Sequence, residues 1–228
     1  VVKSSNALAI LCIVVTITVF SGIVIELLSF DSNRTSESNA VLIDDFNDEK
    51  SIDKKLEGLI GSYYKAYAAG DTTALQEIAY PISDAEISYI SMLSQYIDSY
   101  DVKKISHETG LYDGAYLVSV VYKMSFSRIK TPAPGLDFFY VETDENGKIY
   151  INNLYSAYNM SNEENAVDSN ITARISEYKQ QDDIQALMET AQEDYSKALE
   201  TDSELKTFVE STLPEKIKEW AEEYVNNN

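Results

Sequence analysis

Residues that could perform acid–base or nucleophilic chemistry are sparse in this chain. His107 is the sole histidine and Cys12 is the sole cysteine. A catalytic triad would need His107 beside an activated nucleophile, and no Gly-x-Ser-x-Gly elbow supplies that nucleophile. Zinc sites need several His or Cys ligands, and the segment 144–147 (DENG) lacks the alternating ligands of a calcium loop. The sequence therefore predicts no catalytic residue, no metal site and no cofactor.

A small group of polar and aromatic residues could instead line a pocket for an apolar molecule. The predicted strand register turns His107 toward the apolar face of a sheet, where a general base would lie, although a hydrogen-bonded structural role is more common for such a histidine. Tyrosines pack well in half-buried sheets and also offer hydroxyl donors. The candidate pocket residues are Tyr63, Tyr67, His107, Tyr116, Val120 and Asp137.

Helical periodicity predicts three helices ahead of the strands. Apolar residues three and four positions apart indicate a helix over 53–69, and a glycine follows its end. A short capped helix is expected over about 72–79, and a proline stops it. The third helix begins near Ser83, three residues before Glu86 as in a capping box, and is expected to run to about residue 100.

Two glycine-containing turns predict two β-hairpins. Asp113-Gly114 suits a tight two-residue turn, which would pair His107 with Val120. Alternation over 116–126 places aromatic and aliphatic side chains on one face, which we expect to be buried. Asn146-Gly147 predicts the second hairpin. The expected fold class is α+β, with three helices packed on a curved four-stranded antiparallel sheet.

The beginning of the chain is strongly apolar. Residues 7–25 (ALAILCIVVTITVFSGIVI) carry no charge, and a helix of this length covers about 30 Å, the thickness of the hydrocarbon core of a bilayer. With Lys3 on the amino-terminal side, we expect a cytoplasmic tail at 1–6, a transmembrane signal anchor at 7–29 and an extracytoplasmic remainder at the cell membrane. Cleavage of this segment as a signal peptide, followed by secretion, is the alternative.

The rest of the chain is acidic and divides into three parts. The sequence has 38 acidic and 18 basic residues, a net charge of −20 that would repel nucleic acid. Residues 30–52 are predicted to form a polar linker, 53–156 the α+β domain and 157–228 a helical extension. That extension either packs on the domain or binds a protein partner or a second copy, with Trp220 as the candidate interaction anchor.

Residues 63–75 (YYKAYAAGDTTAL) form a tyrosine-rich helix that ends in Ala-Gly-Asp, and 138–141 (FFYV) with 144–148 (DENGK) form a late hairpin. These two parts resemble the nuclear-transport-factor-like superfamily, whose cone-shaped, cystatin-like α+β fold is shared with ketosteroid isomerases. The resemblance implies that helices close over a curved sheet. Enzymes of this superfamily usually place strands between their early helices, and none is evident between residues 70 and 100, which lowers the expectation of a deep enzyme-like pocket.

A membrane-tethered domain of this fold also resembles the bitopic assembly subunits of type IV secretion and conjugation machines, which implies a scaffold role made of protein contacts. The sequence therefore favours a membrane-anchored, extracytoplasmic, non-catalytic interaction module of the cell envelope. The alternative is a domain that binds, or less favourably isomerises, a small apolar ligand between the first helix and the sheet. A cavity of at least about 300 Å³ beside His107 would favour the ligand, and a filled core with an exposed apolar helical face would favour the module.

Overall fold

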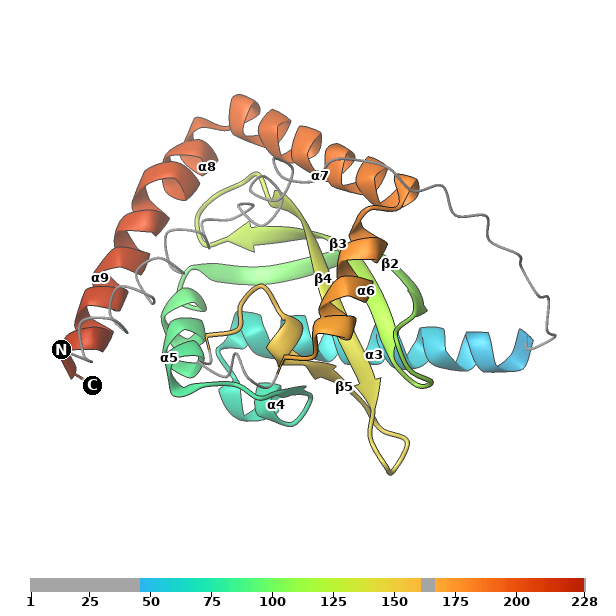
Figure 1. The fold of residues 1–228 in the computed structure, drawn as a ribbon. Coiled ribbons are helices and arrows are strands. Elements are labelled where there is room, and N and C mark those ends of the chain that lie inside the picture. The colour runs from blue at the N-terminus through green and yellow to red at the C-terminus, as the bar shows by residue number, and fades with distance from the viewer. Residues whose placement is uncertain (1–45, 161–166, 228) are drawn as a thin grey trace.

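A mixed β-sheet lies between two helical layers in the computed structural model, which describes residues 46–160 and 167–227 (Figure 1). The elements in chain order are α3 (Phe46–Ala69), α4 (Thr72–Gln76), β1 (Ala79–Tyr80), α5 (Asp84–Leu93), β2 (Ile97–Thr109), β3 (Tyr116–Phe126), β4 (Ala133–Thr143), β5 (Ile149–Asn152), the 3₁₀ turn η2 (Asn153–Tyr155), α6 (Ser169–Lys179), α7 (Asp182–Thr201), α8 (Ser203–Thr207), the π-helical turn η4 (Phe208–Thr212) and α9 (Leu213–Asn227).

The sheet has five strands in the order β1-β5-β4-β3-β2, and β1 pairs with β5 in parallel. This corrects the predicted four-stranded antiparallel sheet. The additional strand is only two residues long, with Ala79 beside Ile151, and the Ile151 amide donates to the carbonyl of Ile78 at 2.8 Å. A strand therefore does lie between the early helices, where none was expected. Two residues are too few to produce an alternation that sequence patterning could detect.

The third predicted helix also ends earlier than expected. α5 stops at Leu93 and β2 begins at Ile97, so residues 97–100 are strand and not helix. Ser83 does cap α5, since its hydroxyl accepts from the Glu86 amide at 3.2 Å. The spacing of Ile90, Leu93 and Ile97 is helical, but Ile97 is buried opposite Phe126 of β3. A strand residue facing the core satisfied the helical pattern by coincidence.

The first hairpin has a longer loop and a shifted register. Thr109 pairs with Tyr116, and His107 therefore pairs with Val118, not with Val120. The shift amounts to two residues, and because side chains alternate with period two, every residue keeps its predicted face. In the second hairpin Thr143 pairs with Ile149, and the Gly147 amide donates to the Asp144 carbonyl at 2.9 Å.

Two irregularities in β2 keep its apolar residues on one face. The register with β3 shifts between Ile97 and Ser99 and again between Val102 and Lys104. Each shift is where a β-bulge inserts one extra residue into the strand. Val102 and Ile105 consequently point to the same side although three positions separate them, and that side packs against the core.

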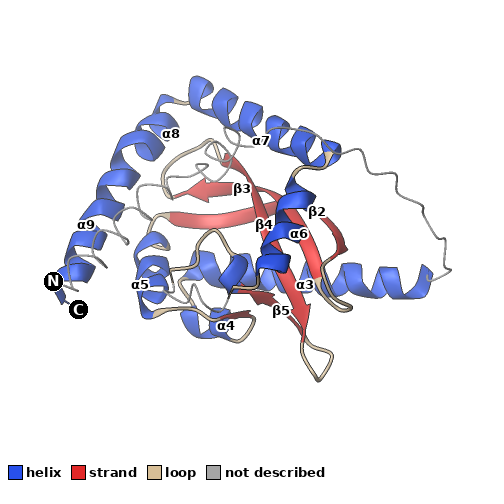
Figure 2. Cartoon of the chain, viewed as in Figure 1, coloured by secondary structure: helices blue, strands red, loops and turns tan. Residues whose placement is uncertain are grey.

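Both faces of the sheet are covered (Figure 2). The larger core lies between the sheet and the helices α3, α5, α8 and α9, and Leu205, Leu213 and Ile217 are among its most buried members. The smaller core lies on the opposite face, where α6 and the first half of α7 cover Leu117 and Leu136. Residues of the predicted helical extension thus share cores with residues of the predicted α+β domain.

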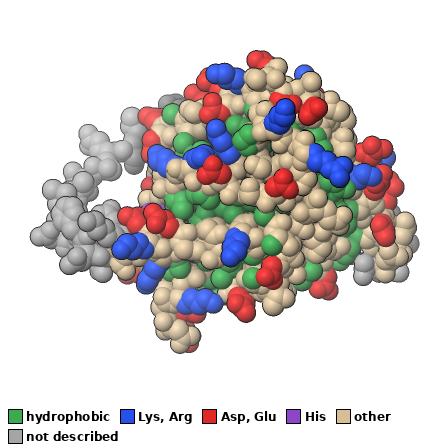
Figure 3. Space-filling model, turned by 180° about the vertical axis from the view of Figure 1, so that it is seen from behind, with side chains coloured by type: hydrophobic (Ala, Val, Ile, Leu, Met, Phe, Trp, Pro, Cys, Tyr) green, Lys and Arg blue, Asp and Glu red, His purple; other side chains and the backbone are tan. Residues whose placement is uncertain are grey.

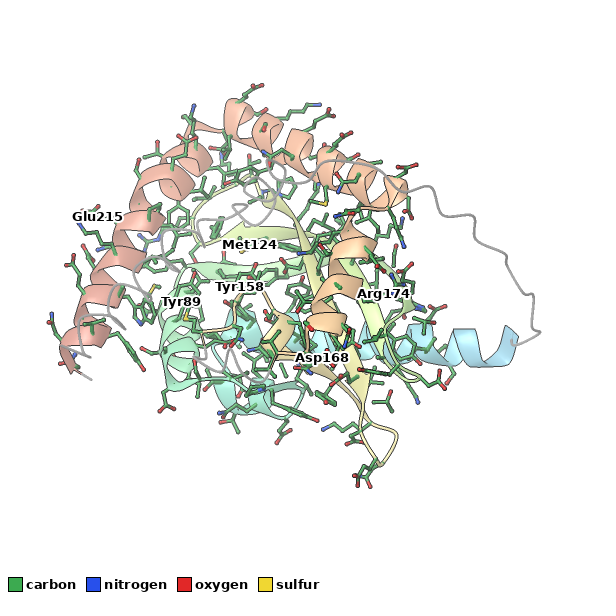
Figure 4. All side chains as sticks on the ribbon, in the orientation of Figure 1. Tyr89, Met124, Tyr158, Asp168, Arg174 and Glu215 are labelled. Carbon is green, nitrogen blue, oxygen red and sulfur yellow. The ribbon has the colours of Figure 1, made fainter. Side chains whose placement is uncertain are left out.

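A direct polar link fixes α6 on the sheet. Arg174 Nη2 lies 2.5 Å from Glu108 Oε1 of β2, and Figure 4 labels this arginine on α6. The Tyr178 hydroxyl lies 3.1 Å from the Ser119 hydroxyl of β3. The face of β3 that points away from the larger core is therefore an interior surface at Leu117 and Ser119.

The predicted membrane anchor needs correction. Throughout residues 46–160 and 167–227, no helix combines the length and the apolar character that crossing a bilayer demands. The apolar segment 7–29 that carried the prediction, like the tail at 1–6, lies outside the described residues. The transmembrane and signal-anchor assignments, and the cell-membrane localisation that rested on them, are therefore without structural support. The predicted linker 30–52 overlaps the described residues only at its end, where α3 already begins at Phe46.

Candidate functional site

A partly buried carboxylate lies beside the larger core. Asp137 is on β4 beside Val120 of β3, on the sheet face that α3 covers. Its side chain is bonded to three tyrosine hydroxyls, which come from α3, β3 and the segment after η2. They are Tyr64 at 2.8 Å, Tyr158 at 3.1 Å and Tyr122 at 3.5 Å. We call Asp137 with these three tyrosines the Asp137 cluster.

Further aromatic rings enclose the Asp137 cluster. Tyr100 of β2 stacks on Tyr64 with centroids 4.6 Å apart and lies 5.4 Å from Tyr122. Tyr63 of α3 packs on Phe139 of β4 at 5.1 Å, and Tyr67 lies 6.3 Å from Tyr158. The helical spacing of the α3 tyrosines places all three over the sheet. The carboxylate is therefore surrounded by aromatic surface.

Burial changes the acid–base properties of this site. Loss of hydration raises the pKa of Asp137 to about 6, although the hydrogen bonds from Tyr64, Tyr158 and Tyr122 act in the opposite direction. Burial also raises the pKa of the Tyr64 hydroxyl well above its ordinary value of 10, and the Asp137 charge adds to this effect. The tyrosines thus stay protonated, and they act as donors to an ionised Asp137 at neutral pH.

A second acid, Glu86, is more deeply buried than Asp137 and also acts on Tyr63. Glu86, in the first turn of α5, is 2% exposed and accepts two bonds from the Asn153 amide, at 2.9 and 3.0 Å. Burial raises the pKa of Glu86 to about 7, while the bonds from Asn153 and the Met160 backbone amide lower it. Glu86 and Asp137 both raise the pKa of Tyr63, after the larger effect of burial. The pKa of the Tyr63 hydroxyl therefore depends on both carboxyl groups.

The structure divides the predicted pocket residues into separate groups. Tyr63 is 3% exposed, and Tyr67 and Val120 are equally buried in the core. His107 instead lies with its Nε2 2.9 Å from Asp53 Oδ1 of α3, and its ring contacts the edge of Tyr116 at 5.9 Å. Asp137 bonds to none of these residues. His107 and Asp137 are thus not combined into one acid–base site.

Sequence reasoning did not assign Glu86 or Tyr158 to the site. Glu86 matches a capping box, but its carboxylate turns to Asn153, a contact 67 residues away in sequence. Tyr158 falls in a segment that is loop-like in composition. The available signal was weak and general, namely the density of tyrosines on the first helix and the first hairpin.

A separate groove of about 590 Å³ lies between α5 and α9, which run side by side in Figure 1. Met92, Tyr96, Trp220 and Tyr224 give it apolar surface, and Lys216, Glu219 and Glu223 give it charge. Trp220 is 8% exposed, so most of its ring is buried against other residues of the protein. The indole N–H donates to the Ser88 hydroxyl at 2.9 Å, and the ring contacts Tyr89, which reaches from α5 in Figure 4.

Comparison with known proteins gives no relative: no family model, no curated protein and no solved structure matches the chain. The resemblance to nuclear-transport-factor-like domains and to type IV secretion subunits therefore stays a prediction. Within the part of the chain that the structure describes, no three His, Cys, Asp or Glu side chains converge as a metal site would require.

Gly135 of β4 lies directly under the ring of Tyr122, where a side chain would have no room. A methyl group added at Gly135 would lie 2.3 Å from Cζ of that ring, so Gly135→Ala should displace Tyr122 from the Asp137 cluster. Crowding of this kind destabilises by about 1–3 kcal/mol, which urea denaturation would measure. Gly61→Ala is the matched control, because nothing lies within 4 Å and a helical alanine should stabilise by about 0.5–1 kcal/mol. An unchanged stability of Gly135→Ala would contradict this packing.

Proposed function

We propose that this protein is a non-catalytic interaction module that binds a basic, amphipathic segment of another protein in the groove between α5 and α9. The observation that carries the proposal is the groove itself, with its aromatic floor and acidic rim. Aromatic side chains in such a floor are typical anchors for apolar side chains of a partner. An amphipathic helix laid into a groove is a common mode of peptide recognition.

Charge favours a basic partner. The chain has a net charge of −20, and acidic side chains are spread over the face in Figure 3 and not gathered in one patch. On α9, Lys216 pairs with Glu219 at 2.7 Å and Lys218 approaches Glu222 at 3.9 Å. Glu223 has no ion pair among the described residues and lines the groove. A lysine or arginine of the partner would complete this rim.

The alternative, binding of a small apolar molecule beside His107, has less support. Tyr63, Tyr67 and Val120 are packed against neighbouring core residues, and His107 is engaged with Asp53. An interaction module needs no catalytic residue, and a partner can reach the groove because the groove lies on the surface.

The sole tryptophan provides a direct test. Trp220 lines the groove, so its fluorescence reports on an occupant without added labels. We expect saturable emission changes with a helical model peptide that has leucines on one face and lysines on the other. The same peptide with glutamates in place of the lysines should leave the emission unchanged.

Charge-reversal variants separate groove binding from general attraction to an acidic protein. Glu223→Lys should weaken binding of the lysine peptide about fivefold or more, because a rim contact of about 1 kcal/mol is lost and repulsion is added. Glu177→Lys on α6 changes the net charge equally but lies on an exposed position away from the groove. Equal weakening by both variants, or no response of Trp220 at all, would refute the proposal.

A further inference from the structure

The Asp137 carboxylate is a partly buried negative charge without a cationic partner among the described residues. Every side-chain hydrogen bond that the described residues make to this carboxylate comes from a tyrosine hydroxyl, and none of their ion pairs involves it. Removal from bulk water strengthens the attraction between a carboxylate and a cation. The Asp137 cluster therefore offers a negative charge with which a cationic ligand can pair.

The surrounding rings offer the faces that organic cations prefer. The Tyr67 ring lies 6.3 Å from the Tyr158 ring, and Tyr122, whose hydroxyl is 3.5 Å from Asp137, has its ring 5.4 Å from that of Tyr100. Quaternary ammonium groups bind over such rings because the negative ring face attracts the charge, and the attraction grows when water is excluded. Glu86, which also raises the pKa of Tyr67, adds a second negative charge when it is ionised.

Tyr158 lies outside the helix and the strands that carry the other tyrosines of the site. It belongs to no helix or strand, and it is half-buried, as is Tyr100, whereas Tyr64 and Tyr122 are buried. Its hydroxyl occupies a position 3.1 Å from Asp137 Oδ1. If the ring of Tyr158 swings outward, it leaves a space beside the carboxylate that is bounded by aromatic rings.

We propose that the Asp137 cluster binds a quaternary ammonium group in the position of the Tyr158 ring, with Asp137 as counter-ion and Tyr67, Tyr100 and Tyr122 as the aromatic walls. A quaternary ammonium fits better than a primary amine, because it needs no hydrogen-bond acceptor. Tyr64 and Tyr122 can then keep their bonds to Asp137. This site is independent of the groove between α5 and α9.

Choline and its neutral isostere 3,3-dimethyl-1-butanol are the probes, because they share their shape and differ in charge. Proton NMR of the ligand in the presence of the full chain should show the methyl signal of choline shifted by the aromatic ring currents. We expect choline to bind at least about tenfold more tightly than the neutral alcohol. Equal binding of the two, or no shift at millimolar choline, would overturn the proposal.

Two variants locate the binding. Asp137→Asn keeps the side-chain shape and removes the charge, so the preference for choline over the alcohol should fall to about twofold or less. Tyr158→Ala removes the ring that fills the site and keeps the carboxylate, so choline should bind more tightly than to the wild type. Tyr158→Ala also keeps the test decisive if Asp137→Asn does not fold. An unchanged preference in Asp137→Asn, or weaker binding in Tyr158→Ala, would contradict the proposed position.

The ammonium group could come from a free solute or from a lipid head group. Phosphatidylcholine vesicles distinguish the sources by co-sedimentation. Binding of choline without vesicle binding assigns a free solute. Vesicle binding that soluble choline displaces assigns a head group. Vesicle binding that choline does not displace, and that Asp137→Asn does not weaken, would count against this site.

Discussion

Replacing Trp220 with alanine should lower the free energy of unfolding by about 3–5 kcal/mol. The indole is 8% exposed, contacts the rings of Tyr89 and Tyr224, and donates to Ser88. Alanine would leave a cavity between α5 and α9 and an unpaired serine hydroxyl. Because the total stability of a domain is about 5–15 kcal/mol, this single change should remove a large part of it. Circular dichroism during urea denaturation measures the loss, since the variant retains no tryptophan.

Trp220→Phe and Ser88→Ala divide that loss into its parts. Phenylalanine retains an aromatic ring against Tyr89 and Tyr224 but no N–H donor, so the expected loss is about 1–2 kcal/mol. Ser88→Ala removes only the acceptor and should lose about 1 kcal/mol. A loss below about 1 kcal/mol for Trp220→Ala would mean that α9 docks weakly, and that Trp220 is free to serve as the partner anchor that the sequence indicated.

Stability should fall as the pH rises from about 4 to about 8, because folding raises the pKa of two carboxyl groups. The pKa of Asp137 is raised from 3.8 to about 6, and that of Glu86 from 4.5 to about 7. Between the unfolded and the folded pKa, the native state binds more protons than the unfolded chain, so the free energy of unfolding decreases with pH. The stabilisation is complete below about pH 4 and lost above about pH 7. Each shift corresponds to about 3 kcal/mol.

Conservative variants isolate this effect from the titration of other acids. The stability of Asp137→Asn relative to the wild type should increase by about 3 kcal/mol from pH 4 to pH 8, and Glu86→Gln should behave likewise. Glu57→Gln removes one exposed charge from α3, and its relative stability should change little over the same range. A flat difference for Asp137→Asn would mean that its carboxyl is hydrated in solution, which would also weaken the case for an ammonium site.

Local patterns in the sequence located many elements correctly. The cap at Ser83, the inner face of β3 and the glycine turns at Gly114 and Gly147 depend on neighbouring residues, and local rules describe them well. The predictions became wrong where distant contacts decide the outcome. Ile97 continues a helical spacing, yet pairing with β3 makes it a strand residue. Tertiary contacts overrode the local preference there.

The candidate site was the least predictable part. Asp137 was named from the sequence, but its partners Tyr64, Tyr122 and Tyr158 come from a helix, a strand and a turn that only the complete fold brings together. His107 is the sole histidine, and its partner Asp53 is 54 positions away in the sequence. Glu86 matches the spacing of a capping box, yet its carboxylate accepts hydrogen bonds from Asn153. Sequence patterns report the face of an element, whereas a site depends on which faces meet.

The order in which the larger core is completed has a consequence for the nascent chain. Leu56 of α3 leaves the ribosome first, and Ile217 of α9, which completes the same core, follows roughly 160 residues later. At usual rates of synthesis this delay is roughly 8–30 s. For roughly the last 90 residues of that synthesis, the apolar ends of β3 and β4, including Phe126 and Ala133, lack the helices that will cover them. Ribosome-bound chains that stop before α9 should therefore be bound by chaperones more strongly than the finished protein.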